Sequence, residues 1–281
     1  MAATSHDQAM YEPALTTREF SRKISALGIK KANTQGWQLF LLALLSGLYI
    51  SIGGHLFLVA LEQDMGRIVG GLVFSVGLVL VVIAGAELFT GNIIMLVGAV
   101  TRQFSARKVL RNWLIVYLGN LIGAVLFAWG VWHAGLLGTW PEHINRLGAF
   151  ASTVAGTKAA LSFGDCFLRG LFCNMLVILA IIMATLSKDI ISKIACCMLP
   201  IMAFVACGFE HCVANMYLIP LGFMAGGAPW QVYCSFSTGG LWHNLVPVTL
   251  GNIVGGIVIL FLHPNRIRQL HYLWHGQPQT T

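Results

Sequence analysis

The sequence predicts an all-α, polytopic membrane protein whose six transmembrane helices form a 3+3 inverted repeat with two broken helices. Three observations lead to this fold class. The first is composition: of 281 residues, 57% are hydrophobic and only 10% are charged, with a mean hydropathy of +0.77. Soluble domains carry about 25% charged residues, so one soluble core could not hide this much apolar surface. The other two observations are interrupted hydrophobic stretches and an internal repeat.

Six stretches are long enough to cross the hydrocarbon core, which takes about 20 apolar residues in a helix. Their residue ranges are 39–60, 68–100, 109–132, 167–186, 190–223 and 243–262. The second and fifth are too long for one straight span, and each contains a polar motif, GAELFTGN or GFEHCVAN. A glutamate in a membrane segment is costly unless it is buried in protein or lines a cavity. Both stretches are therefore predicted to be broken helices.

The chain repeats itself at two offsets. A shift of 123 residues places Glu87 and Asn92 on Glu210 and Asn215. A shift of 132 places the segment NWLIVYLGNLIG, which begins at Asn112, on NLVPVTLGNIVG. Three helices followed by three matching helices must have opposite orientations, because three is an odd number. Inverted repeats of this kind are typical of transporters and channels.

The distribution of basic residues predicts that both termini face the cytoplasm of a cell inner (plasma) membrane. With the N-terminus inside, outer segments hold only Arg67, Arg146 and Lys158, and Arg169 sits near a helix start. The inner segments hold thirteen: Arg18, Arg22, Lys23, Lys30, Lys31, Arg102, Arg107, Lys108, Arg111, Lys188, Lys193, Arg266 and Arg268. The domains expected are a cytoplasmic segment (1–36), the six-helix channel domain (37–262) and a cytoplasmic tail (263–281). The first 35 residues lack the apolar stretch of a cleavable signal peptide.

Composition and motifs also exclude several classes of protein. The net charge of +7 is spread between hydrophobic runs, so no nucleic-acid partner is expected. The sequence has no CxxC, CxxCH or HExxH motif, and we expect no metal, cofactor or catalytic residue. A membrane enzyme subunit that binds haem or metal remains an alternative from another class. Its candidate ligands would be His55, His133, His211 and His243.

The two interruptions are the candidate site. In an inverted repeat the broken helices meet near the membrane midplane, and their half-helix N-termini offer amide donors and positive dipole ends that favour an anion. Thr90 and His211 are the side chains that could bind it. The glutamates would repel an anion, so we expect them to accept hydrogen bonds from loop amides or to hold the neighbouring histidine. The loop-stabilising set is Glu87, Glu210, Asn92 and Asn215.

Other polar and aromatic residues have two interpretations each. Lys158 is either an exposed loop lysine or a vestibule lysine that concentrates anions by focusing the field. Asn120 and Asn252 follow glycines, and they either bond across helices or line a pore. Some large apolar residues are either ordinary core or a hydrophobic constriction; they are Phe74, Leu78, Phe89 and Phe204.

The motifs GAELFTGN, GFEHCVANMYLIPLG and NLVPVTLGNIVGG resemble those of the formate–nitrite transporter family, in the same order and with the right helices between them. The resemblance covers about residues 26–262. It implies an aquaporin-like protomer in a homopentamer with one pore each, and an N-terminal segment, here 1–31, that can occlude the cytoplasmic mouth. It maps the central histidine to His211 and the threonine of the first break to Thr90. Further positions that it assigns are the pore residues Asn174, Asn252 and Lys158, and the constriction residues Phe74, Leu78, Phe89, Val177 and Phe204.

The resulting expectation is a passive channel for small monovalent anions of weak acids, with formate as the substrate and nitrite or hydrosulfide as alternatives. His211 could donate a proton so that a neutral acid crosses the next apolar ring, because histidine changes charge in the physiological range. A water or glycerol channel is a further alternative, although paired NPA motifs are absent. Two departures from the family pattern are Glu87, where enteric formate channels carry Asp, and Cys212, where Ser is commoner.

Overall fold

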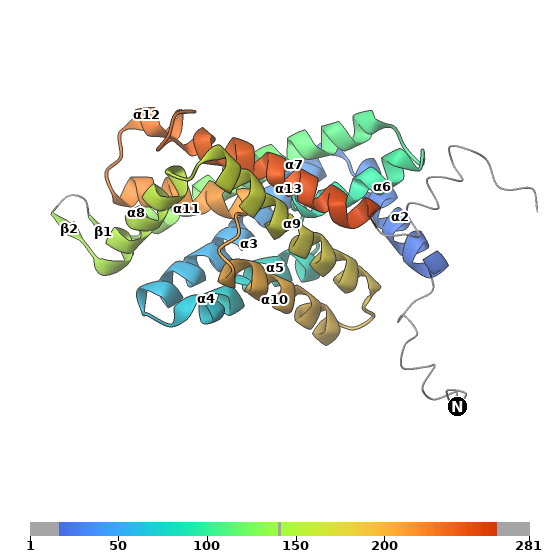
Figure 1. Ribbon diagram of the computed structural model, residues 1–281, viewed down its shortest axis with the longest axis horizontal. Coiled ribbons are helices and arrows are strands. Elements are labelled where there is room, and N and C mark those ends of the chain that lie inside the picture. Colours follow the sequence, from blue (N-terminus) through green and yellow to red (C-terminus); the bar gives the residue numbers. More distant parts are fainter. Residues whose placement is uncertain (1–16, 140–141, 263–281) are drawn as a thin grey trace, which may run out of the picture.

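A computed structural model describes residues 17–139 and 142–262, and the described chain is almost entirely helical (Figure 1). The first helices in chain order are α2 (Thr17–Asn33), α3 (Gly36–Glu62), α4 (Gly66–Phe74), α5 (Val76–Ala84), the 3-10 helix η1 (Gly91–Ile94), α6 (Met95–Val100) and α7 (Ala106–His133). A small hairpin follows, β1 (Gly138–Thr139) paired antiparallel with β2 (His143–Ile144). The remaining helices are α8 (Arg146–Ala159), α9 (Phe163–Leu186), α10 (Ile190–Ala206), α11 (Cys212–Ala225), α12 (Trp230–Tyr233) and α13 (Leu241–Phe261).

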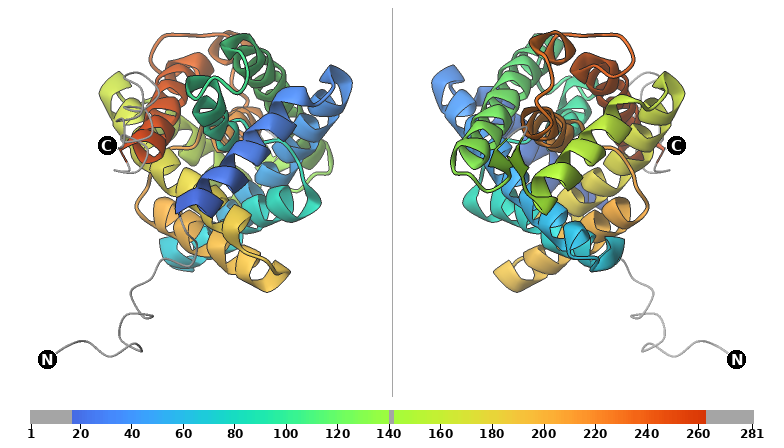
Figure 2. Two further views of the ribbon diagram at one scale, coloured as in Figure 1. Left: turned by 90° about the vertical axis from the view of Figure 1, so that its right-hand side faces the viewer. Right: turned by 90° about the vertical axis from the view of Figure 1, so that its left-hand side faces the viewer.

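Short helices occupy the two ends of an elongated molecule. In Figure 1, α2 and α6 lie at one end of the long axis, and α8, α12 and the β hairpin lie at the other. The end views show α2 crossing one end and α8 crossing the other (Figure 2). The rest of the predicted N-terminal segment, residues 1–16, and the predicted tail, 263–281, lie outside the described residues.

Five helical runs in the described chain are long and apolar enough to cross a membrane: α3, α4 with α5, α7, α9 and α13. They coincide with five of the six predicted stretches. The predicted stretch 190–223 instead forms two shorter apolar helices, α10 and α11. The stretch 68–100 likewise continues beyond α5 into η1 and α6. The chain therefore breaks within both of the stretches that were predicted to contain broken helices.

A glycine with a positive φ angle ends the first helix of each broken pair. Gly85 follows α5 with φ of 78°, and Gly208 lies just beyond α10 with φ of 71°. Residues with a Cβ rarely adopt this left-handed conformation, whereas glycine adopts it readily. After each of these glycines the chain is not helical until the next helix begins, at Gly91 for η1 and at Cys212 for α11. Each polar motif begins in one of these non-helical segments and ends in the first turn of the helix that follows.

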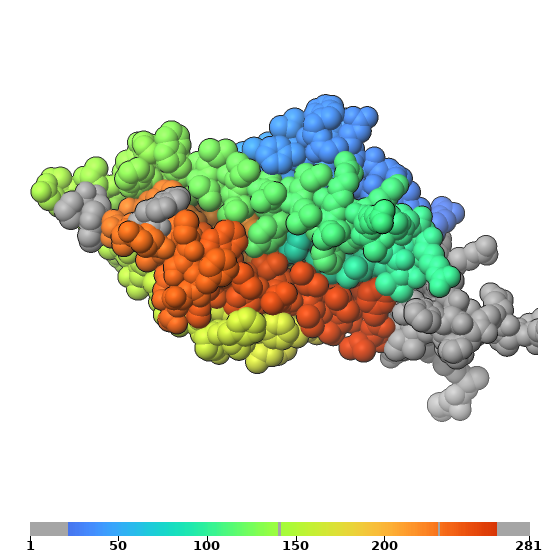
Figure 3. Space-filling view, turned by 90° about the horizontal axis from the view of Figure 1, so that it is seen from above, coloured from blue at the N-terminus to red at the C-terminus, as the bar shows by residue number. Residues whose placement is uncertain are grey.

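The most extensive helix contacts join α3 to α7 and α9 to α13. Glycine allows both pairs to pack backbone against backbone, as is common between membrane helices. Gly123 of α7 lies against the carbonyl of Leu44, and Gly255 of α13 lies against the carbonyl of Leu171. The helices α7 and α13 run side by side along one face (Figure 3). They are joined by a bond of 3.0 Å between the hydroxyls of Tyr117 and Thr249.

Replacing Gly255 with alanine is expected to lower the free energy of unfolding by roughly 1–3 kcal/mol, the usual cost of overpacking. The added Cβ would overlap the carbonyl of Leu171. Thermal unfolding of the purified protein measures the loss. Gly130→Ala is the matched control, because nothing lies within 4 Å of a Cβ at Gly130. An equal loss in both variants would contradict this account of the packing.

Candidate functional site

The two breaks meet at a buried pair of side chains. Oγ1 of Thr90 lies 2.9 Å from Nε2 of His211, and the two residues are 0% and 3% exposed. His211 also caps α11, because its Nδ1 accepts the amide hydrogen of Ala214 at 3.2 Å. A nitrogen that accepts carries no hydrogen, so the hydrogen-bond pattern assigns the hydrogen of the neutral ring to Nε2. Nε2 then donates to Thr90, and the hydroxyl hydrogen of Thr90 is free to donate to a ligand.

The carboxylate of the first break is held by a lysine and an asparagine. Oε2 of Glu87 lies 2.8 Å from Nζ of Lys31 and accepts from Nδ2 of Asn92 at 2.7 Å. Asn92 Nδ2 also donates to Oδ1 of Asn112 at 2.7 Å, and Asn112 Nδ2 donates to the carbonyl of Lys31 at 3.3 Å. These four residues, which we call the α2 network, connect α2, the first break and α7. All four are buried.

The second break has the same set of bonds. Nζ of Lys158 donates to Oε1 of Glu210 at 2.7 Å, and Nδ2 of Asn215 donates to Oε2 at 2.6 Å. Asn215 Nδ2 also donates to Oδ1 of Asn244 at 2.7 Å, and Asn244 Nδ2 donates to the carbonyl of Lys158 at 2.9 Å. We call these four residues the α8 network. In both networks the carboxylate is bound by lysine and asparagine side chains, where sequence reasoning had expected loop amides or the histidine.

Asn252 holds the backbone of the second break. Its Oδ1 accepts the amide hydrogen of Cys212 at 3.0 Å, and its Nδ2 donates to the carbonyls of Gly170 at 2.7 Å and Glu210 at 3.0 Å. Asn120 makes the corresponding bonds in the first break, to Phe89, Ala43 and Glu87. Both amide hydrogens of Asn252 therefore bond to the protein, and this side chain fixes the break.

Asn174 links α9 to the first break and to α13. Its Nδ2 donates to the carbonyl of Asn252 at 2.7 Å and to that of Thr90 at 3.3 Å. Its Oδ1 is buried and has no hydrogen-bond partner within the described chain. Asn174 thus lies beside the central pair and retains an unused acceptor.

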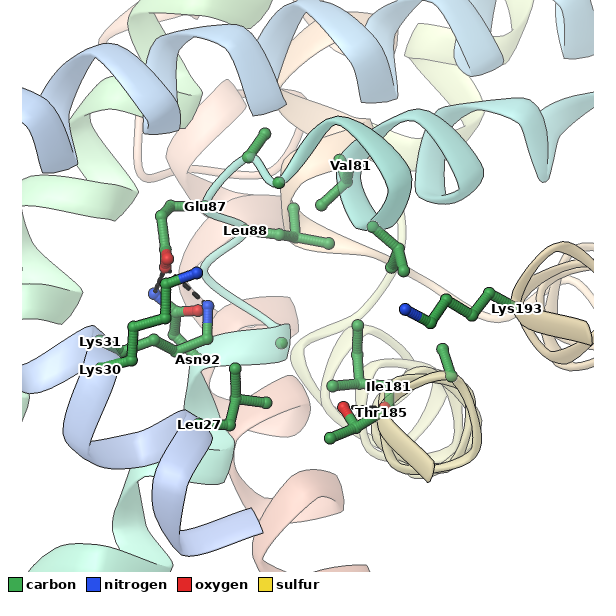
Figure 4. A pocket seen from close by; sticks show the side chains of 15 residues that line it. Leu27, Lys30, Lys31, Val81, Glu87, Leu88, Asn92, Ile181, Thr185 and Lys193 are labelled. Atoms are coloured by element: carbon green, nitrogen blue, oxygen red, sulfur yellow. Dashed lines mark hydrogen bonds and ion pairs between the residues drawn. The ribbon is translucent and has the colours of Figure 1, made fainter. Parts of the chain in front are cut away.

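Two cavities approach the central pair. The α8 cavity, of about 340 Å³, is lined by Lys158 and other residues of α8 and reaches His211. The α2 cavity, of about 310 Å³, is lined by Lys31 and other residues of α2 and reaches Leu88 and Gly91, on either side of Thr90 (Figure 4). Lys158 therefore lines a vestibule from a helix, with its ammonium bound to Glu210. Each cavity contains one network lysine and one network glutamate.

Aromatic rings line the α8 cavity next to His211. Phe74 and Phe204 meet edge to face with ring centroids 5.7 Å apart, and both line the α8 cavity. Phe204 also stacks on His211, with centroids 5.9 Å apart and an interplanar angle of 17°. These two predicted constriction residues lie beside the central pair.

The other predicted constriction residues lie differently. Leu78 and Val177 are each 1% exposed and line neither cavity. Phe89 packs edge to face against Trp113 and Tyr117, with centroids 5.8 and 5.0 Å apart. Its neighbour Leu88 lines the α2 cavity instead.

Sequence reasoning did not assign Lys31, Asn112 and Asn244 to the site. The asparagines coincide at the shift of 132 residues, so the repeat itself contained a signal for them. In the sequence, Lys31 is one of the basic residues that predict the membrane orientation. Its correspondence to Lys158 becomes apparent once both are seen to bind the glutamate of a break.

The other three histidines considered as metal or haem ligands, His55, His133 and His243, have hydrogen-bond partners of their own. Nδ1 of His55 bonds to the hydroxyl of Tyr217 at 2.9 Å, while His133 and His243 bond to backbone carbonyls. Within residues 17–139 and 142–262, no three His, Cys, Asp or Glu side chains form a group suited to a metal ion.

Comparison with known proteins identifies the family. The model of the formate/nitrite transporter family matches residues 18–264. The chain belongs to the formate/nitrite transporter family. A probable formate transporter of Methanothermobacter thermautotrophicus is 38% identical over 85% of this chain and 92% of its own length. The formate channel FocA of Haemophilus influenzae is 32% identical over 95% of this chain and 99% of its own length.

Solved structures agree with this assignment. One described as a pentameric formate channel with formate bound matches with a TM-score of 0.70 and 34% identity, over 85% of this chain and 98% of that chain. The chain is therefore a membrane protein of a transporter and channel family, and its apolar helices are those of a membrane channel. The relatives are transporters and channels, which agrees with the expectation that this protein is not an enzyme.

Glu210→Gln is expected to destabilise the protein by about 3 kcal/mol, because removing one partner of a buried ion pair leaves the other charge uncompensated. The side chains of Lys158 and Glu210 are only 16% and 5% exposed. Thermal unfolding of the purified variant measures the effect. Glu62→Gln is the control, because its partner Arg146 is 69% exposed and such pairs contribute about 0–1 kcal/mol. Similar losses in both variants would contradict a structural role for the Lys158–Glu210 pair.

Proposed function

We propose that the protein is a membrane channel or transporter for small monovalent anions of weak acids, with formate as its substrate. The observation that carries the proposal is the buried pair of Thr90 and His211 between two cavities, with the Thr90 hydroxyl free to donate. A donor in a site that excludes water binds an anion more strongly than it would in bulk solvent. The relatives described as formate channels support formate as the substrate.

Charge at both cavities supports an anionic substrate. The α2 cavity is lined by three lysines and one glutamate, which are Lys30, Lys31, Lys193 and Glu87. The α8 cavity is lined by Arg67, Lys158, Arg169 and Glu210, together with His211. Each cavity therefore has two more cationic than anionic side chains if His211 is neutral. A cleft with one sign of charge and low-dielectric walls raises the local concentration of the opposite ion.

Nitrite and hydrosulfide are the alternative substrates. Like formate, they are small, carry one negative charge and would meet the same hydroxyl and imidazole. A water or glycerol channel would not need the excess of cationic side chains at both cavities.

Proton coupling is the finer part of the proposal. A bare anion beside Phe74 and Phe204 pays a large desolvation cost, which protonation to the neutral acid removes. An imidazolium carries hydrogen on both nitrogens, whereas Nδ1 of His211 now accepts from Ala214. Protonation of His211 therefore requires this capping bond to break. We propose that Thr90 contacts the anion and that His211 supplies a proton through the Thr90 hydroxyl only after the bond to Ala214 is lost.

We also propose that the two halves form a 3+3 inverted repeat of six membrane segments, with the α2 end in the cytoplasm. The matching α2 and α8 networks support the repeat, because each bond in one has a counterpart in the other. The basic residues near the α2 end support the orientation. The basic residues Arg266 and Arg268 counted for the tail lie outside the described chain.

A homopentamer with one pore in each protomer is proposed as the assembly. The solved relative described as pentameric supports it, as does the apolar outer face of α7. This face exposes a row of residues at helical spacing, Leu110, Leu114, Leu118, Ile122 and Leu126. Either another protomer or lipid must cover such a row.

Flux into proteoliposomes loaded with a pH-sensitive dye tests the substrate. Formate, nitrite and hydrosulfide are offered in turn to the wild type, and rapid change of internal pH is expected with formate. If none of the three anions enters faster than into empty liposomes, the proposed function is wrong.

His211→Phe is expected to abolish the pH dependence of this flux, because phenylalanine cannot carry a proton. The same stopped-flow assay, repeated over a range of external pH, measures it. His55→Phe is the matched control, since His55 lines neither cavity. Unchanged pH dependence in His211→Phe would rule out the proton relay.

The purified protein is expected to have a protein mass of about 150 kDa, five times the chain mass of 30.5 kDa, as a closed cyclic oligomer. Native mass spectrometry from detergent measures it. A single chain mass as the dominant species would contradict the pentamer.

A further inference from the structure

Two of the three lysines that line the α2 cavity, Lys30 and Lys193, take no part in the networks. The charge of Lys31 is compensated by Glu87 at 2.8 Å. Lys193, in the first turns of α10, enters the cavity from the opposite wall, with its ammonium directed into the space (Figure 4). Its side chain is half-buried, and its Nζ makes no hydrogen bond or ion pair with any residue in the described ranges 17–139 and 142–262.

The neighbours of Lys193 leave its ammonium available. The hydroxyl of Thr185, on the same side of the cavity, donates to the carbonyl of Ile181 at 2.7 Å. The carboxylate of Asp189 caps α10 by accepting the amide hydrogen of Ser192 at 2.8 Å, and it forms no ion pair with Lys193. The unpaired ammonium is therefore the donor that this wall offers to an anion.

The position of Lys193 is unfavourable for the helix itself. The N-terminus of a helix carries a positive partial charge, so a cation in the first turns is destabilising. Arg67 occupies a similar position, in the first turn of α4, where it lines the α8 cavity and likewise forms no ion pair with a described residue. In both cavities, then, an uncompensated cation stands at the start of a helical run that leads into a break, α4 with α5 for Arg67 and α10 for Lys193. An anion in the cavity would offset the unfavourable field.

We propose that Lys193 binds a small monovalent anion in the α2 cavity before the anion reaches Thr90. The proposal rests on the proposed transport of such anions and adds the residue that captures them on the α2 side. A lysine ammonium is a compact charge with three donors, which suits a small carboxylate or oxyanion that keeps part of its hydration. Lys31 then stabilises the first break, and Lys193 binds the substrate.

Right-side-out and inverted membrane vesicles that contain the full-length protein test this assignment, because they expose opposite faces to the medium. The initial rate of radiolabelled formate entry is measured with benzenesulfonate in the medium. This inhibitor is an anion that stays charged and does not cross lipid. In vesicles that expose the α2 face, Lys193→Gln is expected to raise the half-inhibiting concentration about fivefold, as for the loss of one partly exposed ion pair. Lys193→Arg keeps the charge and should keep inhibition near the wild-type value.

Lys188→Gln is the matched control, because Lys188 is an exposed lysine of the same connection and does not line the cavity. It should leave inhibition unchanged at both faces, and Lys193→Gln should leave it unchanged at the α8 face. An effect confined to inverted vesicles would also support the proposed cytoplasmic position of α2.

Three outcomes would overturn the assignment of Lys193. These are a wild type that benzenesulfonate does not inhibit from the α2 face, a Lys193→Gln variant inhibited like the wild type, and an equal shift in Lys188→Gln. The last would indicate general surface charge. In each of these cases wild-type formate entry shows that the proposed function stands. If the wild type admits no formate in either kind of vesicle, the proposed function fails, and the role of Lys193 fails with it.

Discussion

A carboxylate buried in a membrane protein needs a cation and further hydrogen-bond donors, and the two breaks exist under this constraint. Glu87 and Glu210 obtain their cations from α2 and α8, the short helices at opposite ends of the molecule. In each motif an asparagine side chain donates a further hydrogen bond to the carboxylate. Once these groups are satisfied, the non-helical segments can persist inside an apolar body, and Thr90 and His211 can meet. The central pair thus depends on ion pairs that do not touch it.

The sequence predicts the membrane spans and the breaks because each of them has a signal within a short stretch of residues. Hydrophobic length locates the spans, and a glutamate within a hydrophobic stretch locates each break. Motif position also identifies Thr90 and His211, which the structure brings together. The same logic cannot place Phe89 or Leu88, because helical periodicity says nothing about side-chain direction in a non-helical segment. Lys31 is missed for a different reason: its partner lies 56 residues away along the chain, and a charge near a helix end is also what membrane orientation requires.

Charged side chains lie in the two networks near the ends of the molecule, whereas the central pair is neutral. Lysines of the networks are compensated by glutamates, so they add little net field. The centre holds only neutral donors, because the cap of α11 keeps hydrogen off Nδ1 of His211. A full positive charge there would bind an anion tightly and hold it, whereas a hydroxyl allows it to leave; conduction requires binding weak enough for release.

The compensation of Lys158 by Glu210 has a consequence for how such a channel can change over evolutionary time. The residues that build the break and the residues that set the field at the entrance are different side chains on different helices. A substitution at Arg67 or Lys193 changes the attraction felt by an incoming ion and leaves the buried ion pairs intact. The strength with which each entrance attracts anions can therefore change while the interior stays constrained by the folding of the protein.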